Sequence, residues 1–243
     1  MTKDKAFYDQ DEVLAIYLAH RQRRDNPNDA LERPVFLDLA GDLRNLDIID
    51  LGCGDAAFGR EALSGGARSY LGIELAEGMV QLALENLADT SGKVERKGIE
   101  DWQAQEGQAD FVVSRLALNY VEHLEPVFRE VYKALRPGGR FVVTLEHPVI
   151  TSHFASLESG KRSSWLVDDY FKSGARKHVW LGKEITKYHH SIEDYLSMLE
   201  EAGLRLERLR ESKPQREHFH SEAEFQRRLR IPLFLFLAAS KPA

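Results

Sequence analysis

Cysteine is almost absent from this chain of 243 residues, which contains only Cys53. A single thiol excludes an internal disulfide and is typical of a reducing compartment. Long apolar runs are also missing: the longest, 231–239, is too short to span a bilayer and is interrupted by Pro232. The first twenty residues contain no apolar segment of the signal-peptide type. We therefore expect a cytoplasmic protein without a membrane-spanning segment.

Positive charge is in short supply as well. The chain has 33 Lys and Arg against 39 Asp and Glu, a net charge of −6 and a pI near 5.9. This balance argues against a general nucleic-acid or membrane-surface binder. One segment, 208–230, carries seven basic residues against four Glu. It predicts a solvated face, with an RNA-binding patch as the alternative.

The nine histidines include no pair with the spacing of a helical metal site. His189 and His190 are adjacent, so their side chains diverge, and His218 and His220 lie in a polar linker. Metal-binding histidines on one helix face are four residues apart. We expect no metal site.

Short apolar runs alternate with helical patterns through the middle of the chain. Two predicted helices, 10–24 and 29–42, come first, separated by a turn around Pro27. Strand and helix taking turns predicts an α/β fold, a doubly wound parallel sheet that binds ligands at the carboxyl ends of its strands. The predicted strands are 45–52, 68–75, 93–99, 109–116 and 140–148, and the helices between them are 58–63, 79–87 and 124–135.

The alternation breaks after Pro148. The following segment is polar and rich in Trp, Tyr and His, which predicts a cap or insertion. A helix at 191–201 and strands at 204–211 and 231–239 then resume the pattern. The linker between these two strands is too long for a tight hairpin, but the strands can still pair antiparallel.

A glycine-rich loop follows the first predicted strand. Gly52, Gly54 and Ala57, with Glu74 twenty positions after Gly54, fit the dinucleotide-binding fingerprint. Two carboxylates, Asp50 and Asp55, flank the glycines, however, and would repel a pyrophosphate. They suit a cationic ligand, and S-adenosylmethionine carries an ammonium and a sulfonium but no phosphate. The residues therefore favour S-adenosylmethionine over NAD, with Glu74 accepting hydrogen bonds from the ribose hydroxyls.

Five ordered blocks resemble the class I S-adenosylmethionine-dependent methyltransferases: "DLGCG", "YLGIELAEGMV", "GIEDW", "ADFVVSRLALNYVEH" and "ALRPGGRFVVTLEHP". The resemblance implies a seven-stranded, mostly parallel sheet whose last strand is antiparallel. Glu146-His147-Pro148 and Tyr188-His189 are similar to bacterial small-molecule methyltransferases. The expected organisation is an N-terminal helical lid (1–44), a cofactor-binding core (45–148), a cap for the substrate (149–190), and a closing helix with the C-terminal strands (191–243).

Residue by residue, the resemblance places the cofactor at the strand ends. Asp50 and the glycines fall at its methionine end, and either Glu100 or Asp101 meets the adenine amino group. Cys53 is expected to be a small packing residue within the loop. Ala56 replaces the usual third glycine, and its β-carbon requires a negative φ. The implied cofactor-binding set is Asp50, Gly52, Cys53, Gly54, Glu74, Leu75, Met79, Ile99, Glu100, Asp101, Ser114 and Arg115.

Three further groups of residues are candidates. Tyr17 and Arg21 lie one helical turn apart, so Arg21 either pairs with the cofactor carboxylate or belongs to a solvated basic cluster. His147 and His189 are the candidate catalytic bases, with a structural capping role as the alternative for His147. The candidate substrate-binding residues, which could instead form the core of the insertion, are Trp165, Tyr170, Trp180, Tyr188 and His190.

The predicted function is methyl transfer from S-adenosylmethionine to an oxygen or nitrogen of a small, aromatic or heterocyclic metabolite. We expect a monomer or homodimer that does not bind nucleic acid. The alternatives are an RNA (tRNA) methyltransferase that uses the basic segment 208–230, a non-catalytic cofactor-binding scaffold, and a nucleotide-dependent oxidoreductase, which the acidic loop disfavours.

Overall fold

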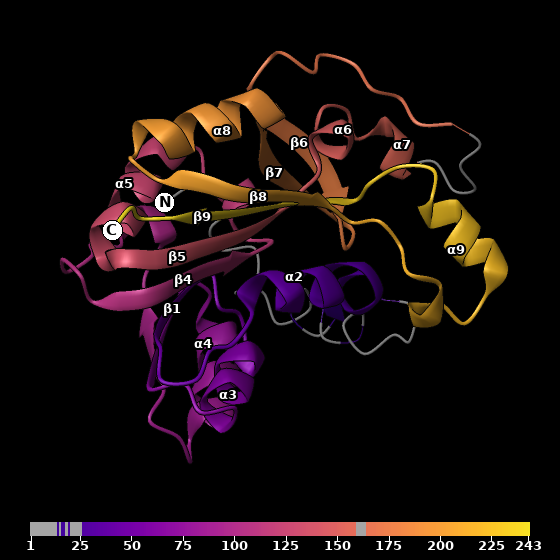
Figure 1. Ribbon diagram of the computed structural model, residues 1–243. Helices are drawn as coiled ribbons and strands as arrows, with labels where there is room; N and C mark the ends of the chain where they lie inside the picture. The colour runs from indigo at the N-terminus through magenta and orange to yellow at the C-terminus, as the bar shows by residue number, and fades with distance from the viewer. Residues whose placement is uncertain (1–13, 15, 18, 20–25, 159–163) are drawn as a thin grey trace.

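The computed structural model describes residues 14, 16, 17, 19, 26–158 and 164–243 (Figure 1). At its centre is a seven-stranded sheet of order β3-β2-β1-β4-β5-β9-β8, in which β9 runs antiparallel to both of its neighbours. This confirms the predicted doubly wound α/β sheet with an antiparallel last strand. The strands are β1 Asp47–Leu51, β2 Ser69–Glu74, β3 Lys93–Arg96, β4 Ala109–Arg115, β5 Leu135–Glu146, β8 Arg205–Glu211 and β9 Phe234–Ser240.

Helices cover both faces of the sheet. In Figure 1, α2, α3 and α4 lie on one side, and α5 and α8 lie on the other. The helical segments are η2 Asn28–Glu32, α2 Arg33–Ala40, α3 Ala57–Ser64, α4 Glu77–Leu87, η3 Ile99–Asp101, η4 Leu118–Tyr120, α5 Leu124–Ala134, α6 Pro148–Thr151, α7 Ala155–Glu158, α8 Ile192–Glu201, η5 Arg216–His218 and α9 Glu222–Arg228.

Successive strand residues point into two different cores. Ile48 packs with the α2–α4 side and Ile49 with the α5–α8 side, and Val112 and Val113 divide in the same way. Side chains alternate along a strand, so a strand covered on both faces is apolar at consecutive positions. This explains why the sequence showed continuous apolar runs rather than alternation.

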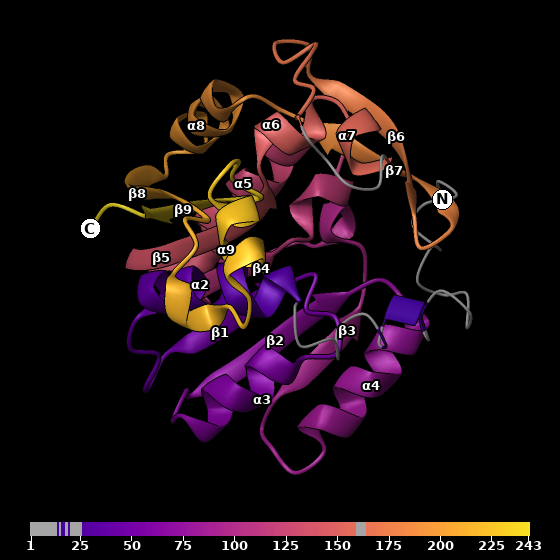
Figure 2. The same cartoon turned by 90° about the vertical axis from the view of Figure 1, so that its right-hand side faces the viewer.

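A separate β-hairpin lies beyond the carboxyl edge of the sheet (Figure 2). It consists of β6 Gly174–Trp180 and β7 Lys183–His189, paired antiparallel. Leu181 and Gly182 form its two-residue turn, with φ of 51° and 79°. Positive φ at both turn positions matches the twist of a tight hairpin. The aromatic-rich insertion is therefore folded, and β7 packs against η4 of the core.

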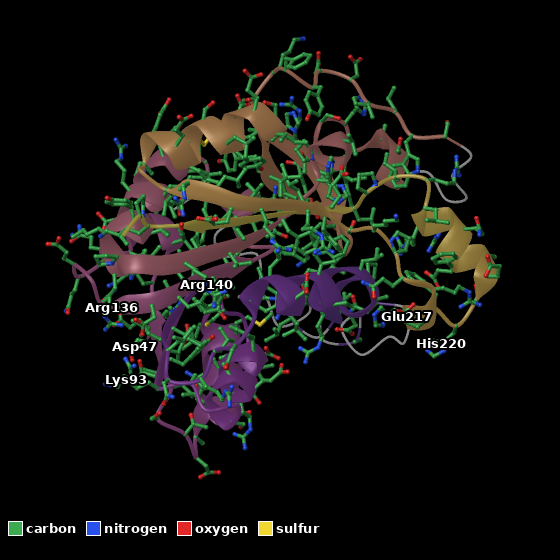
Figure 3. All side chains as sticks on the ribbon, viewed as in Figure 1. Asp47, Lys93, Arg136, Arg140, Glu217 and His220 are labelled. Atoms are coloured by element: carbon green, nitrogen blue, oxygen red, sulfur yellow. The ribbon has the colours of Figure 1, made fainter. Side chains whose placement is uncertain are left out.

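The opposite edge of the sheet is closed by ion pairs. Arg136 lies 2.9 Å from Asp47 and 2.7 Å from Asp110 (Figure 3). These pairs join the start of β1 and β4 to β5 where the strands begin. Arg136 therefore ties three neighbouring strands together at the edge opposite the carboxyl ends.

Two segments differ from the sequence-based expectation, and a third cannot be compared with it. Most of the helix predicted at 10–24 lies outside the described residues. The helix predicted at 29–42 begins with the π-helical turn η2. Strand β5 begins at Leu135 rather than near 140, and its pairing with β4 shifts register between Leu135 and Arg140. No helix among the described residues is both long and apolar enough to cross a membrane.

Candidate active site

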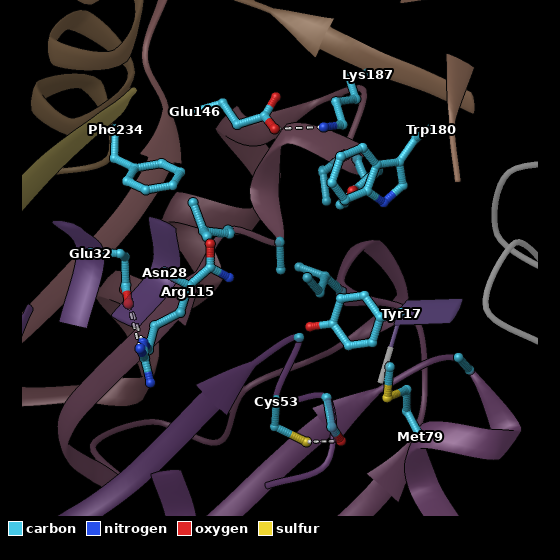
Figure 4. A pocket seen from close by; sticks show the side chains of 18 of the residues that line it. Tyr17, Asn28, Glu32, Cys53, Met79, Arg115, Glu146, Trp180, Lys187 and Phe234 are labelled. Atoms are coloured by element: carbon cyan, nitrogen blue, oxygen red, sulfur yellow. Dashed lines mark hydrogen bonds and ion pairs between the residues drawn. The ribbon is translucent and has the colours of Figure 1, made fainter. Parts of the chain in front are cut away.

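A cavity of about 740 Å³ lies at the carboxyl ends of β1, β2, β4 and β5. Its other walls come from the β6–β7 hairpin, from α9 and from Tyr17 (Figures 2 and 4). Doubly wound sheets bind ligands at this edge because loops on either side of the strand-order reversal diverge there. The cavity thus lies where the sequence predicted a ligand site.

Asp50 places a buried carboxylate beside the cavity. Its Oδ2 accepts a hydrogen bond of 2.7 Å from the Tyr70 hydroxyl, while Oδ1 is buried and has no hydrogen-bond partner within the described structure. Burial raises the pKa of Asp50 to about 6, although Tyr70 and the charge of Arg115 oppose the shift. An unsatisfied buried carboxylate oxygen is costly, and a cationic ligand group would satisfy it.

Glycine is required at positions 52 and 54 of the loop for different structural reasons. Gly52 has a φ of 77°, and a β-carbon there would lie 2.2 Å from that of Ala117. Gly54 has a φ of 57°, and a β-carbon there would meet no atom within 4 Å. Gly52 therefore permits close packing of the backbone, whereas Gly54 leaves room on the cavity side.

The expectation of a negative φ at Ala56 is wrong. Ala56 adopts φ 54° and ψ 24°, the left-handed conformation, and is completely buried. Its N–H donates to the carbonyl of Cys53 at 3.0 Å, which closes the turn that leads into α3. A left-handed non-glycine residue costs about 1–2 kcal/mol. The loop therefore keeps the left-handed conformation that glycine usually adopts at this position, at that cost in free energy.

Glu74 at the end of β2 is held by three backbone donors. The N–H of Gly54 donates to Oε2 at 3.0 Å, and the N–H groups of Leu75 and Ala76 donate to Oε1 at 2.8 and 2.9 Å. An ionised carboxylate offers about four acceptor positions. Glu74 is thus an oriented carboxylate that also ties the glycine loop to β2.

The expected adenine region lies on the same cavity. Leu75, Met79, Ile99 and Glu100 all line it. Asp101, the alternative to Glu100, does not. The geometry therefore favours Glu100 as the acid next to the adenine amino group, which stays a prediction.

Known proteins that are similar to this chain agree with this geometry. A methyltransferase domain family matches residues 49–143. A solved S-adenosylmethionine-dependent methyltransferase from Mesorhizobium loti is 33% identical, with a TM-score of 0.79, over 86% of this chain and 97% of that one. A candidate S-adenosylmethionine-dependent methyltransferase from Listeria monocytogenes is 30% identical, with a TM-score of 0.80, over 87% and 97% of the two chains. The chain belongs to the class I S-adenosylmethionine-dependent methyltransferases. A curated relative, the demethylmenaquinone methyltransferase of Lactococcus lactis, is 27% identical over 59% of this chain and 60% of its own length.

In this methyltransferase, the two polar residues at the end of β4, Ser114 and Arg115, have different surroundings. Ser114 is fully buried, does not line the cavity, and donates to the carbonyl of Leu51 at 2.7 Å. Arg115 lines the cavity and pairs with Glu32, with 3.0 Å between Nε and Oε1. Its guanidinium lies 4.4 Å from the centre of the Phe36 ring. Arg115 therefore anchors the N-terminal helical segment to the sheet.

His147 lies outside the cavity lining. Its Nδ1 accepts a hydrogen bond from the Val149 N–H at 3.2 Å, and its Nε2 lies 3.0 Å from Glu211. Burial lowers the pKa of His147, with Glu211 opposing the shift. The ring caps α6 and joins β5 to β8. This geometry supports the capping alternative rather than a proton-transfer role.

His189 and His190 are also outside the lining. The His189 ring lies between the Thr151 hydroxyl, at 2.7 Å, and the Tyr170 carbonyl, at 2.9 Å. His190 is buried edge-on against the Tyr195 ring, at 5.4 Å. Burial lowers the pKa of both imidazoles. His189 therefore joins the hairpin to α6 and to the segment around Tyr170, and His190 packs against α8.

The aromatic candidates divide into two groups. Trp180 and Tyr188, from the hairpin, line the cavity. Trp165 and Tyr170 do not, and Tyr170 packs edge-on against His189, with 5.8 Å between the ring centres. The insertion thus contributes both cavity wall and a small core of its own.

An ion pair that the sequence did not reveal stands at the cavity wall. Lys187 Nζ lies 2.6 Å from Glu146 Oε1, and the Lys187 side chain is only 5% exposed (Figure 4). The two residues are 41 positions apart on β7 and β5. The sequence predicts a role for His147 of the Glu-His-Pro block, whereas the residue of this block that lines the cavity is Glu146.

Helix α9 was also missed as part of the site. Its residues Arg227 and Arg228 line the cavity, together with Phe234 at the start of β9. Both arginines face Glu224, at 2.9 and 3.8 Å. Basic character within 208–230 was noticed, but nothing in the local pattern places α9 over the sheet edge.

The remaining candidates are Tyr17 and Arg21. The Tyr17 ring points into the cavity in Figure 4. Arg21 lies outside the described residues, so its predicted role stays a prediction. Within the described part of the chain, no group of three His, Cys, Asp or Glu side chains is placed to hold a metal ion.

Proposed function

We propose that this methyltransferase binds S-adenosylmethionine along the glycine loop and transfers its methyl group to an oxygen or nitrogen of a small, flat metabolite. The observation that supports this proposal is one continuous cavity with two chemically different halves. One half has carboxylates at the strand ends, and the other has aromatic side chains from the hairpin.

The residues of the first half fit the cofactor. The unsatisfied Oδ1 of Asp50 suits the ammonium group, and the oriented carboxylate of Glu74 suits the ribose hydroxyls. Gly54 leaves space on the cavity side, and Ile99 with Glu100 forms the expected adenine end. S-adenosylmethionine supplies an activated methyl group on a sulfonium sulfur. The protein's part is then to align the acceptor and to exclude water.

The second half favours a small acceptor over RNA. Trp180, Tyr188 and Tyr120 bring aromatic rings to the wall. Four arginines of the basic segment have acidic neighbours: Arg210 faces Asp38, Arg216 faces Glu222, and Arg227 and Arg228 face Glu224. Paired arginines attract phosphates less strongly than unpaired ones.

The first test is the binding of S-adenosylhomocysteine, measured by calorimetry with NAD and NADP as controls. We expect micromolar binding of S-adenosylhomocysteine and none of the dinucleotides. Glu74→Ala should weaken the binding of S-adenosylhomocysteine about tenfold or more, because a charge-assisted hydrogen bond contributes roughly 1.5–3 kcal/mol. Glu77→Ala is the matched control, since Glu77 lies on the exposed first turn of α4 and pairs with Arg96. Binding of NAD, or equal effects of both substitutions, would contradict the proposal.

A further inference from the structure

The ion pair of Glu146, which is half-buried, and Lys187, which is buried, is costly as a structural element. The side chains are 24% and 5% exposed, and 2.6 Å separates Oε1 from Nζ. Desolvating two charges usually costs more than their attraction returns, and apolar replacements of similar volume are often neutral or stabilising. A pair of this kind in a cavity wall therefore indicates a functional use.

The surroundings of the pair fix its geometry. Glu146 is the last residue of β5, and its backbone N–H donates to Asn119 Oδ1 at 2.8 Å. Lys187 Nζ lies 5.5 Å from the ring centres of both Tyr120 and Trp180. A cation among aromatic faces is held in place without further hydrogen-bond acceptors. Within the described part of the chain, the anion paired with Lys187 is the Glu146 carboxylate.

The pair faces the cofactor side of the cavity. Figure 4 shows Glu146 and Lys187 across the cavity from Cys53 and Met79, with Trp180 beside them. An acceptor between these two sides would have its flat surface near Trp180 and its reacting group near Glu146. The pair has no net charge, and the aromatic faces are already occupied by Lys187. This arrangement fits a neutral N–H or O–H group better than an ammonium.

We propose that Glu146 is the catalytic residue that binds the N–H or O–H of a neutral, flat acceptor and takes its proton, and that Lys187 positions it. This rests on the proposed methyl transfer. The acceptor's lone pair forms the new bond to the methyl carbon, and the electrons of the broken carbon–sulfur bond stay on sulfur. The acceptor's proton passes to Glu146, which becomes a neutral acid and later releases the proton to water.

The test compares two probes of the same shape, indole and benzofuran, in the presence of saturating S-adenosylhomocysteine. Indole carries an N–H donor and benzofuran does not. Wild type should bind indole roughly tenfold more tightly, as expected for a hydrogen bond to a charged acceptor. Ligand-observed NMR titration measures both affinities without requiring turnover.

The key variant is the double substitution Glu146→Leu with Lys187→Met, which removes the pair without leaving a buried charge. It should unfold at the wild-type temperature or above, bind S-adenosylhomocysteine within about threefold of wild type, and lose the preference for indole. Glu125→Gln, on the exposed first turn of α5, is the control and should change none of these.

The outcomes separate the two proposals. If wild type binds S-adenosylhomocysteine but does not distinguish the probes, or binds neither, the role of Glu146 is wrong and the proposed function stands. A double variant that keeps the preference for indole also overturns it. If S-adenosylhomocysteine itself does not bind, both proposals fail.

Discussion

At the scale of single residues, Asp50 shows a conflict between burial and charge. It is 3% exposed, and burial raises its pKa from 3.8 to about 6 despite the Tyr70 hydrogen bond. Because the folded pKa lies above the unfolded one, the fold favours the protonated form. The stability of the protein should therefore fall as the pH rises from about 4 through about 6. Without a ligand, ionised Asp50 is a destabilising residue.

Asp50→Asn should remove this penalty. At pH 7 we expect the variant to be more stable than wild type by an amount on the order of 2 kcal/mol, and the difference should disappear near pH 4. Urea denaturation at both pH values measures it. Binding of S-adenosylhomocysteine should behave in the opposite way, weakening in wild type below pH 6 because its ammonium requires the ionised carboxylate. If the stability difference between Asp50→Asn and wild type were the same at pH 7 as at pH 4, this account would be contradicted.

Adjacent residues at the end of β5 show a limit of sequence-based prediction. Glu146 and His147 were recognised together, and the imidazole was the more attractive base by its ordinary pKa. In the structure Glu146 lines the cavity, whereas the His147 ring turns away to cap α6. Neighbouring residues at a strand end point in different directions. The direction depends on the start of α6 and on the contact with Glu211, 64 positions away.

At the scale of secondary-structure elements, α3 carries a residue that the fingerprint did not single out. Gly59 lies where a β-carbon would come within 2.3 Å of the Tyr70 ring. The absence of a side chain lets α3 pack on β2, with the Tyr70 hydroxyl on Asp50. The role of close helix–strand packing, usual for the third glycine of such loops, therefore falls to Gly59.

Gly59→Ala should destabilise the protein by about 1–3 kcal/mol, because extra volume in a packed contact forces side chains or backbone to shift. Chemical denaturation measures the loss. Gly65→Ala at the end of α3 is the matched control, since its β-carbon would approach no atom closer than 3.3 Å and φ is −78°. Equal losses in the two variants would mean that contact with the Tyr70 ring does not decide the effect.

At the scale of the whole molecule, the sequence allowed the sheet to be predicted, together with the edge at which Asp50, Gly52 and Glu74 line the cavity. Asp50, Gly52 and Glu74 lie at ends of consecutive strands, and the parallel order brings strand ends to one edge. The acceptor half depends on contacts between distant segments. Lys187 reaches Glu146 from an inserted hairpin, and Arg228 reaches the cavity from a helix between β8 and β9. No local pattern determines where such insertions fold back.

The reactivity of the single cysteine, Cys53, can report whether a ligand occupies the cavity. Cys53 lies in the glycine loop at the cavity wall, half-buried, and burial raises its pKa. Dithionitrobenzoate should therefore release one coloured thionitrobenzoate per chain. Cys53 should react at least about a hundredfold more slowly in the folded protein than in the unfolded one. Saturating S-adenosylhomocysteine should slow the reaction further, whereas NAD should leave its rate unchanged. The rate of thiol modification would then report whether the cavity is occupied, with no engineered label.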